Sequence, residues 1–186
     1  MYNQAQQSIR AIIKMTEQDA TNKIGKSFVW LAWILALAIL VYIFQGVLDK
    51  QFNPNTNLAS SINGKGKTEV HLQQNRQGHY LAQGTINGHS VTFLLDTGAT
   101  QVSIPQHLAQ VFNLPRYGTY RVQTANGTVN VIETKIEQLT IGNILLNNVA
   151  AHINPGMKSN EILLGMSALK RVEFSQKGKQ LTLKTY

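Results

Sequence analysis

VTFLLDTGAT, at residues 91–100, is the stretch that decides the fold of this chain. Apolar side chains at alternate positions of its first half predict a β-strand with one buried face. The strand runs straight into Asp96-Thr97-Gly98, where Gly98 permits a sharp turn and a close approach of the backbone. Asp96 is the only aspartate between Lys50 and the C-terminus. A lone aspartate after a strand is usually a turn former, so the rest of the chain has to show whether Asp96 also carries chemistry.

Turn signals at short intervals predict a mostly antiparallel β domain over residues 69–186. Three two-residue signals typical of hairpins lie between apolar runs: Asn87-Gly88, Asn126-Gly127 and Gly142-Asn143. The strands predicted around these turns, and one more at the C-terminus, cover residues 80–86, 90–95, 121–125, 128–132, 136–141, 144–153 and 180–184. Two short helices are expected at residues 105–112 and 167–172. Such a domain closes as a small barrel or a sandwich.

An apolar segment at residues 28–48 predicts a transmembrane helix. As a helix it is about 30 Å long, which is enough for one bilayer crossing. The run 28–44 has no polar interruption that would give it a wet face, which argues against a buried helix of a soluble domain. It is also too long for the core of a cleaved signal peptide. The basic residues Arg10, Lys14, Lys23 and Lys26 precede it, so the positive-inside rule puts residues 1–27 in the cytoplasm.

The same rule puts everything after the helix outside the cytoplasm, which in a bacterium means an inner-membrane protein with a periplasmic domain. Residues 49–68 are rich in Asn, Ser, Gly and Lys and contain few large apolar side chains. This composition predicts a flexible linker between the helix and the domain at residues 69–186.

Composition excludes several classes of function. The net charge is +8, but Lys and Arg are spread along the chain without a block interleaved with aromatics, so no nucleic-acid partner is expected. The absence of cysteine excludes disulfides, thiol catalysis and cysteine-bound metals. The histidines, at positions 71, 79, 89, 107 and 152, lack the spacing of metal ligands. We therefore expect neither a metal nor another cofactor.

Three motifs give the chain a family resemblance: LLDTGAT at residues 94–100, TANG at residues 124–127 and ILLGM at residues 162–166. Over about residues 78–175 the chain resembles the retropepsin-like aspartic proteases, most closely the bacterial membrane-anchored members with one N-terminal transmembrane helix. The resemblance implies a single-lobe closed β-barrel with one or two short helices, following the membrane helix. It implies an aspartic endopeptidase acting on peptides or proteins.

The resemblance also implies roles for particular residues. Asp96 would be the catalytic residue, and its loop would be supported by Thr97, Gly98, Ala99 and Thr100. The hairpin at residues 121–132 would form a flap over the substrate, with Thr124, Ala125, Asn126 and Gly127 at its tip. The strand that ends at Leu163, Leu164 and Gly165 would pack beneath the active-site loop. An ordinary hairpin turn without a lid function is the alternative for Asn126-Gly127.

The chemistry of the family needs two facing carboxylates that share one proton, and one chain supplies one. We therefore expect a homodimer with Asp96 from each chain, in which Thr97 braces the paired loops across the two-fold axis. Viral members have an aspartate in place of Thr100 and an arginine in place of Met166, so their ion pair is absent here. Terminal strands interleave at the viral interface, and residues 181–183 are the analogous candidates. The alternative is a catalytically inactive module of this fold that binds peptides or assembles complexes at the membrane.

Overall fold

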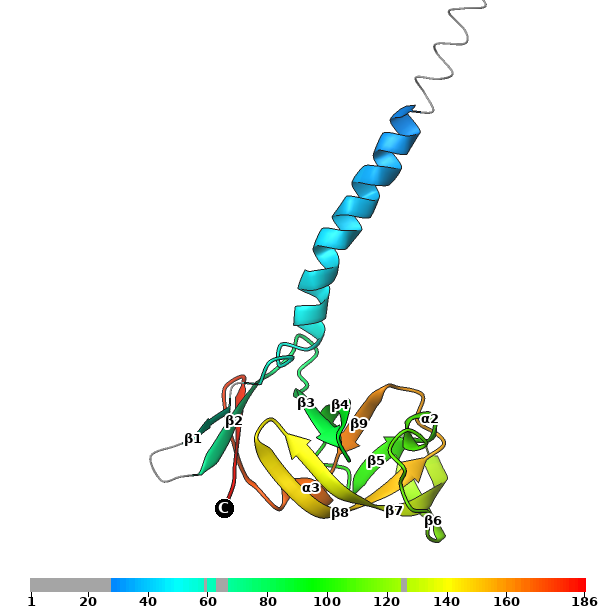
Figure 1. Ribbon diagram of the computed structural model, residues 1–186, viewed down its shortest axis with the longest axis vertical. Helices are drawn as coiled ribbons and strands as arrows, with labels where there is room; N and C mark the ends of the chain where they lie inside the picture. Colours follow the sequence, from blue (N-terminus) through cyan, green and yellow to red (C-terminus); the bar gives the residue numbers. More distant parts are fainter. Residues whose placement is uncertain (1–27, 59, 63–66, 125–126) are drawn as a thin grey trace, which may run out of the picture. The chain divides into compact units, whose positions relative to one another are not determined.

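The computed structural model describes residues 28–58, 60–62, 67–124 and 127–186 (Figure 1). The chain divides into two compact units, Met1–Leu48 and Asp49–Tyr186. The predicted cytoplasmic segment, residues 1–27, lies outside the described residues. In the described part, the first unit therefore consists of helix, and the strands belong to the second unit.

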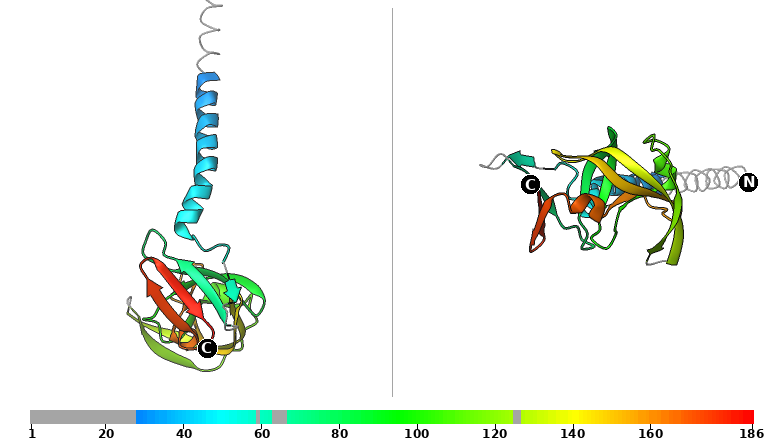
Figure 2. Two further views of the ribbon diagram at one scale, coloured as in Figure 1. Left: turned by 90° about the vertical axis from the view of Figure 1, so that its left-hand side faces the viewer. Right: turned by 90° about the horizontal axis from the view of Figure 1, so that it is seen from below.

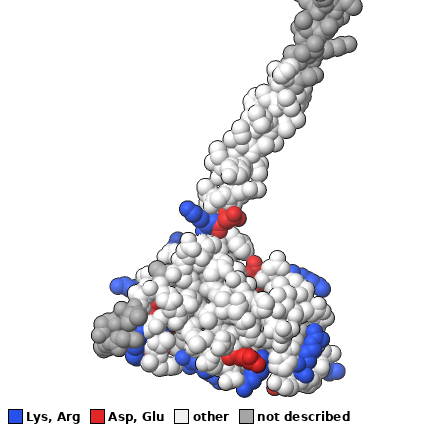
Figure 3. Space-filling model, viewed as in Figure 1, with Lys and Arg blue, Asp and Glu red and all other residues white. Residues whose placement is uncertain are grey.

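An apolar helix spans Phe28–Phe52. It begins with the predicted apolar run and continues past the predicted end at Leu48, and its length is about 37 Å at 1.5 Å per residue. Its large apolar side chains are exposed, unlike those of a helix in the core of a soluble domain. Figure 3 shows no charged side chain along this helix before its C-terminal end. Within the described part of the chain it is the one helix long and apolar enough to span a membrane.

Residues 53–58 and 60–62 fall within the predicted flexible linker, and several of them make contacts with the domain. Asn55 is buried, and its side-chain amide donates to the carbonyl oxygens of Gln73 and Leu81 at 2.9 and 2.7 Å. The Asn55 Oδ1 accepts a hydrogen bond from the Gln73 N–H at 2.7 Å. Leu58 packs against the core, and Ser60–Ile62 forms strand β1. A polar composition is thus compatible with a packed segment, because Asn55 completes the hydrogen bonding of the neighbouring strands.

The ends of the second unit meet in a four-stranded antiparallel sheet of order β1-β2-β11-β10. After β1 its strands are β2 (Thr68–Gln73), β10 (Glu173–Lys177) and β11 (Gln180–Lys184), and Figure 2 shows β10, β11 and β2 side by side. The alternating apolar residues Leu181 and Leu183 of β11 are buried against the core. Strand β11, which contains the candidate residues for interleaving, is therefore paired on both sides within one chain.

The other strands form a seven-stranded sheet of order β3-β4-β9-β5-β8-β7-β6. They are β3 (Leu81–Ile86), β4 (His89–Leu95), β5 (Val102–Pro105), β6 (Thr119–Thr124), β7 (Gly127–Ile141), β8 (Ile144–Asn154) and β9 (Glu161–Leu164). A further pairing of β3 with β7, with Gly84 opposite Ile141, closes this sheet on itself. A Cβ atom on Gly84 would collide with the Thr140 carbonyl oxygen and the Phe93 ring, so the seam needs a glycine. The fold is thus mostly β, as the sequence predicts.

Turn chemistry explains the hairpins. Asn87 and Gly88 both have positive φ, 49° and 83°, as the tight turn between β3 and β4 requires. Gly142 has φ of 54° at the turn between β7 and β8. Where the sequence predicted two strands at residues 128–132 and 136–141, β7 runs unbroken, because its pairing with β8 continues across residues 133–135. Thr134 in this stretch is buried, and its hydroxyl donates to the Pro115 carbonyl oxygen at 2.6 Å.

Two short helices, α2 (Gln106–Ala109) and α3 (Met166–Leu169), lie within or beside the predicted ranges. α2 follows β5 directly, and α3 follows β9 with Gly165 as its N-cap. Both helices contribute buried side chains to the core that fills the barrel, among them Ala109, Ala168 and Leu169. α3 therefore fixes the backbone at the end of β9.

Candidate active site

Asp96 lies where β4 leaves the barrel. The parallel partner of β4 is β9, with Leu95 opposite Leu164, and the Asp96 N–H donates to the Leu164 carbonyl oxygen at 3.2 Å. Residues 96–100 then turn back as a loop, which we call the active-site loop. Within it the Gly98 N–H donates to Asp96 Oδ1 at 2.8 Å, and the Ala99 N–H donates to the Asp96 carbonyl oxygen at 3.3 Å. These bonds fix the direction of the carboxylate.

The second motif holds the active-site loop from the other side. The N–H groups of Met166 and Ser167 donate to the carbonyl oxygens of Ala99 and Thr100, at 2.8 and 3.0 Å. A Cβ atom on Gly165 would collide with the carbonyl oxygen of Ala99, so only a glycine lets the two backbones approach this closely. The structure thus brings together the motifs at residues 94–100 and 162–166, which are far apart in sequence.

The two positions that carry an ion pair in viral members behave differently here. Thr100 is exposed, whereas Met166 is half-buried and packs against the core. The connection between the two segments is made by backbone hydrogen bonds and by Ser167, whose hydroxyl accepts from the Val102 N–H at 3.0 Å and donates to the Ala150 carbonyl oxygen at 2.7 Å. The Ser167 hydroxyl thus links β5 to β8 by hydrogen bonds. The family resemblance implied no role for this residue.

The predicted flap corresponds to the hairpin of β6 and β7. Of its predicted tip residues, Ala125 and Asn126 lie outside the described residues, and Thr124 and Gly127 flank them. The Thr124 hydroxyl donates to the Gly127 carbonyl oxygen at 2.8 Å. The described part of this hairpin faces the same cavity as Asp96, which it lines with Val122, Gln123, Thr124 and Val129.

The cavity beside Asp96 has a volume of about 510 Å³. The active-site loop lines it with Asp96, Gly98, Ala99 and Thr100, and β9 adds Leu163. The cavity is also lined by three polar side chains that we call the polar floor: Ser103 of β5, and His152 and Asn154 of β8. Asp96 is the only carboxylate among the described residues that line this cavity. Thr97 is exposed on the same loop but does not line the cavity.

Sequence reasoning missed the polar floor, although the sequence carries a signal for it. Polar residues at positions 103, 152 and 154 interrupt strands whose neighbours are aliphatic. Strands β5 and β8 are parallel with Ser103 opposite His152, and residues two apart on a strand share a face. A polar residue on a buried face is the informative observation, because apolar side chains are the default there.

His152 belongs to a short hydrogen-bond network. Its Nδ1 lies 3.2 Å from the Tyr120 hydroxyl, and the Tyr120 hydroxyl donates to Gln101 Oε1 at 3.2 Å. Burial lowers the pKa of His152 below its ordinary value of 6.5. Burial, and then the nearby Glu133 carboxylate, raise the pKa of Tyr120 above 10.0. Both shifts favour the neutral forms, so the network is uncharged at neutral pH.

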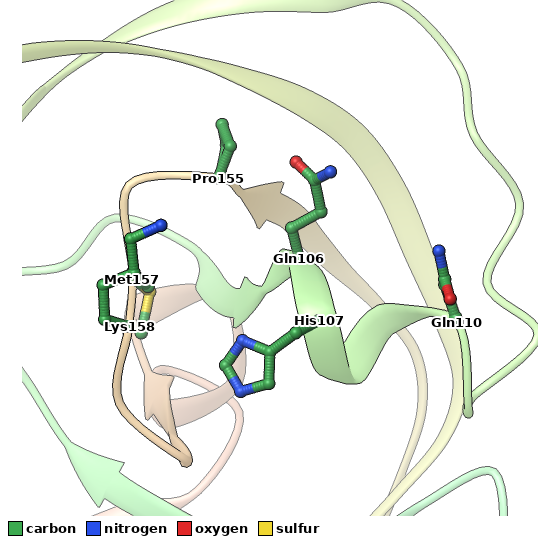
Figure 4. A pocket seen from close by; sticks show the side chains of 6 residues that line it. All are labelled: Gln106, His107, Gln110, Pro155, Met157 and Lys158. Carbon is green, nitrogen blue, oxygen red and sulfur yellow. The ribbon is translucent and has the colours of Figure 1, made fainter.

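A second hollow lies between α2 and the loop after β8 (Figure 4). Its side chains are those of Gln106, His107, Gln110, Pro155, Met157 and Lys158. It contains no carboxylate that could act as an acid or a base. Among the described residues, no three side chains of His, Asp or Glu gather as metal ligands. Asp96 is therefore the one carboxylate among the described residues that line these two cavities.

Comparison with known proteins gives one family and a small group of relatives. Residues 82–171 match the family described as "gag-polyprotein putative aspartyl protease". An uncharacterised protein from the cobV 5′ region of Sinorhizobium sp. is 30% identical over 159 residues, which cover 80% of this chain and 67% of that protein. An uncharacterised protein of Rickettsia prowazekii is 28% identical over 63% of this chain, and the match spans about half of that protein, 52%.

The fold also has a solved counterpart. The crystal structure of a retropepsin-like aspartic protease from Rickettsia conorii matches with a TM-score of 0.55 at 21% identity. The match covers 68% of this chain and 94% of that one. At this level of identity the similarity concerns the fold.

Proposed function

Because the chain belongs to the retropepsin-like aspartic protease family, we propose that it is a membrane-anchored aspartic endopeptidase that acts as a homodimer. The observation that carries the proposal is the position of Asp96. Its carboxylate sits on a loop that both family motifs hold by backbone hydrogen bonds, at the edge of a cavity lined by a hairpin. An aspartate that only forms a turn would not need the hydrogen bonds that Met166 and Ser167 donate to its loop.

The homodimer follows from the number of carboxylates. Hydrolysis by this class of enzyme uses two carboxylates about 3 Å apart that share one proton. Asp96 is the only carboxylate among the described residues lining its cavity, so the second would be Asp96 of another copy. A two-fold axis beside the exposed active-site loop brings the two together and gives each Thr97 hydroxyl a partner loop to bond.

The mechanism is general acid–base catalysis by the pair. The ionised carboxylate takes a proton from a water whose oxygen attacks the peptide carbonyl carbon, and the protonated carboxyl gives its proton to the carbonyl oxygen. The tetrahedral intermediate then breaks its C–N bond while a proton passes to the leaving nitrogen. Because the pair must hold one proton, we expect the highest activity at acidic to mildly acidic pH. The hairpin would cover the bound peptide and exclude bulk water.

The helix Phe28–Phe52 would be the membrane anchor. Its length and apolar surface support a single crossing, and the basic residues that precede it support a cytoplasmic N-terminus. The catalytic domain would then lie on the periplasmic side of the inner membrane.

One observation favours the alternative of a non-catalytic module. Strands β2 and β11 are paired within one chain and flanked by β1 and β10, so the terminal strands that interleave in viral dimers are already in use here. Dimerisation would have to use other surfaces, and a chain that never dimerised could bind peptides without cutting them.

A mixing experiment separates the two readings. Full-length protein in detergent micelles is incubated with a denatured protein between about pH 3 and pH 7, as wild type, as Asp96→Asn and as mixtures of both. We expect cleavage by wild type alone and none by Asp96→Asn. In the mixtures, activity should fall faster than the wild-type fraction, because mixed dimers hold one carboxylate. Strictly proportional activity would contradict the shared site, and no cleavage by folded wild type would favour the non-catalytic module.

A further inference from the structure

We propose that the polar floor selects a substrate side chain that ends in a neutral hydrogen-bond donor, with the carboxamides of Asn and Gln fitting best. This inference rests on the proposed function, because it gives the substrate preference of the same site. His152 would be the residue that determines the preference, and Tyr120 would position it.

The burial of the polar floor is the first support. Ser103 is 3% exposed, His152 is 8% exposed and Asn154 is 6% exposed. Burying such groups costs free energy unless they find hydrogen-bond partners. Apolar side chains at these positions would extend the core, as they do elsewhere on β5 and β8. Polar groups placed against the cavity are therefore suited to a polar ligand.

The hydrogen-bond network fixes which nitrogen of His152 carries the proton. The hydroxyl of Tyr120 has one hydrogen, which it donates to Gln101 Oε1. Its contact with His152 Nδ1 at 3.2 Å then requires Nδ1–H to be the donor. In a neutral imidazole this leaves Nε2 with a lone pair, and burial keeps the ring neutral. His152 is thus a hydrogen-bond acceptor at Nε2.

The lone pair at Nε2 is available to a ligand. Among the described residues, no side chain or backbone group bonds to Nε2. Nε2 is also absent from the fully buried side-chain atoms that lack a partner, so it has contact with solvent. His152 lines the cavity that holds Asp96. An acceptor without a partner, on a residue that lines a cavity, is matched by a donor on the substrate.

Asn154 supplies the complementary group. Its Oδ1 accepts from the Gly156 N–H at 2.8 Å, which orients the side chain so that Nδ2 lies 3.5 Å from the Ser103 hydroxyl oxygen. The Ser103 hydroxyl is itself directed to the sulfur of Met157 at 3.1 Å. Nδ2 therefore has N–H capacity left for an acceptor on the ligand. A carboxamide offers a donor and an acceptor together, whereas a charged tip would have to lose its hydration here.

The test uses peptide binding, which does not depend on catalysis. Full-length Asp96→Asn in detergent micelles is immobilised and exposed to a peptide library with equal amounts of Asn, Gln, Leu and Met at randomised positions. Bound peptides are identified by mass spectrometry. We expect carboxamide residues to be enriched about tenfold over Leu at one position, the order of magnitude of one neutral hydrogen bond. The enrichment should vanish when His152→Leu is added to this chain.

Two further variants keep the test decisive. Tyr120→Phe removes the partner of His152 Nδ1 but keeps the aromatic ring, so it should reduce the carboxamide enrichment. This variant tests the proposal if His152→Leu does not fold. His107→Leu alters an exposed histidine outside this cavity, bonded to Asn160, and should leave the enrichment unchanged. Equal enrichment with and without His152, or no carboxamide preference in the parent chain, would overturn the proposal.

The same library separates this inference from the proposed function. Wild-type protein is incubated with it at mildly acidic pH, and the cut sites are mapped. Peptides that bind with a carboxamide preference but remain uncut would refute catalysis and support the subsite. Cutting without any carboxamide preference would support catalysis and refute the subsite.

Discussion

At the scale of single residues, Gly165 shows why two short motifs so far apart form one site. It is the N-cap of α3 and has an extended backbone, so its requirement for glycine comes from space and not from φ. The carbonyl oxygens of Ala99 and Gln101 occupy the positions that a side chain would need. The backbone at Gly165 can therefore lie this close to the active-site loop only because Gly165 has no Cβ atom.

Replacing Gly165 with alanine should consequently damage the active-site loop. The backbone oxygens around it cannot rotate away, so we expect Gly165→Ala to lower the free energy of unfolding by about 3 kcal/mol. Gly118→Ala is the matched control, because no heavy atom lies within 4 Å of a Cβ atom there. It should change stability by less than about 1 kcal/mol. Urea unfolding followed by circular dichroism measures both, and equal effects would contradict the packing argument.

His152 makes the stability of the domain depend on pH. Burial lowers its pKa in the folded chain below the ordinary value of 6.5, which the unfolded chain keeps. Above both values the ring is neutral in both states and contributes nothing to the pH dependence. As pH falls below about 6.5 the unfolded state binds the proton first, so stability declines. Compared with His152→Leu, wild type should lose stability as pH falls below about 6.5, and parallel curves for the two proteins would refute this.

At the scale of elements, Asn55 acts in place of a missing strand partner. Its side chain bonds the end of β2 at Gln73 and the start of β3 at Leu81. Asn53 supports it, since its Oδ1 accepts from the Asn55 N–H at 3.0 Å. The segment thus ties the small sheet to the barrel and belongs to the folded domain.

Truncating this side chain should destabilise the domain. Asn55→Ala leaves the Gln73 N–H and the Leu81 carbonyl oxygen without their partner, so we expect a loss of about 2 kcal/mol. Asn57→Ala, at an exposed asparagine of the same segment, should cost little. Both tryptophans lie in the helix Phe28–Phe52, so circular dichroism is a better probe of the domain than tryptophan fluorescence. Equal stability of the two variants would show that the bonds of Asn55 contribute nothing.

The sequence predicted the elements whose signals are local. Asn87-Gly88 and Gly142-Asn143 mark hairpins because their residues adopt the backbone angles of tight turns. The closure of β3 on β7 and the hydrogen bonds of Asn55 depend on partners far away in the chain, which no local pattern encodes. Asp96 could be identified from its motif. The Tyr120–His152 contact could not, because it depends on β6 and β8 lying on either side of β7 in the sheet.

At the scale of the whole molecule, the proposed activity depends on how often two chains meet. Strand β11, the candidate for interleaving, is paired on both sides within one chain, so we expect a weak dimer. Restricting chains to a membrane raises their effective concentration.

Diluting the protein in its membrane should therefore reduce its specific activity. For a mostly monomeric protein, a tenfold higher ratio of lipid to protein in reconstituted vesicles should lower the rate per chain by up to about tenfold. Covalent linkage of two chains in tandem serves as the control, because its activity should not respond to the ratio. A rate per chain that stays constant over all ratios would mean that the active species is a tight dimer or a monomer.

On the proposed function, the packing of residues 53–58 also sets how far the catalytic domain could reach from the membrane helix. A free spacer over residues 49–68 would let the domain roam up to about 70 Å from the bilayer. Here the helix runs to Phe52 and the chain is bonded into the domain by Asn53 and Asn55. On the proposed topology, the short connection after Phe52 would keep the cavity within a shell near the membrane surface. Proteins that expose an unfolded segment within that shell would be cut, and the same segment displayed deeper in the periplasm would be spared.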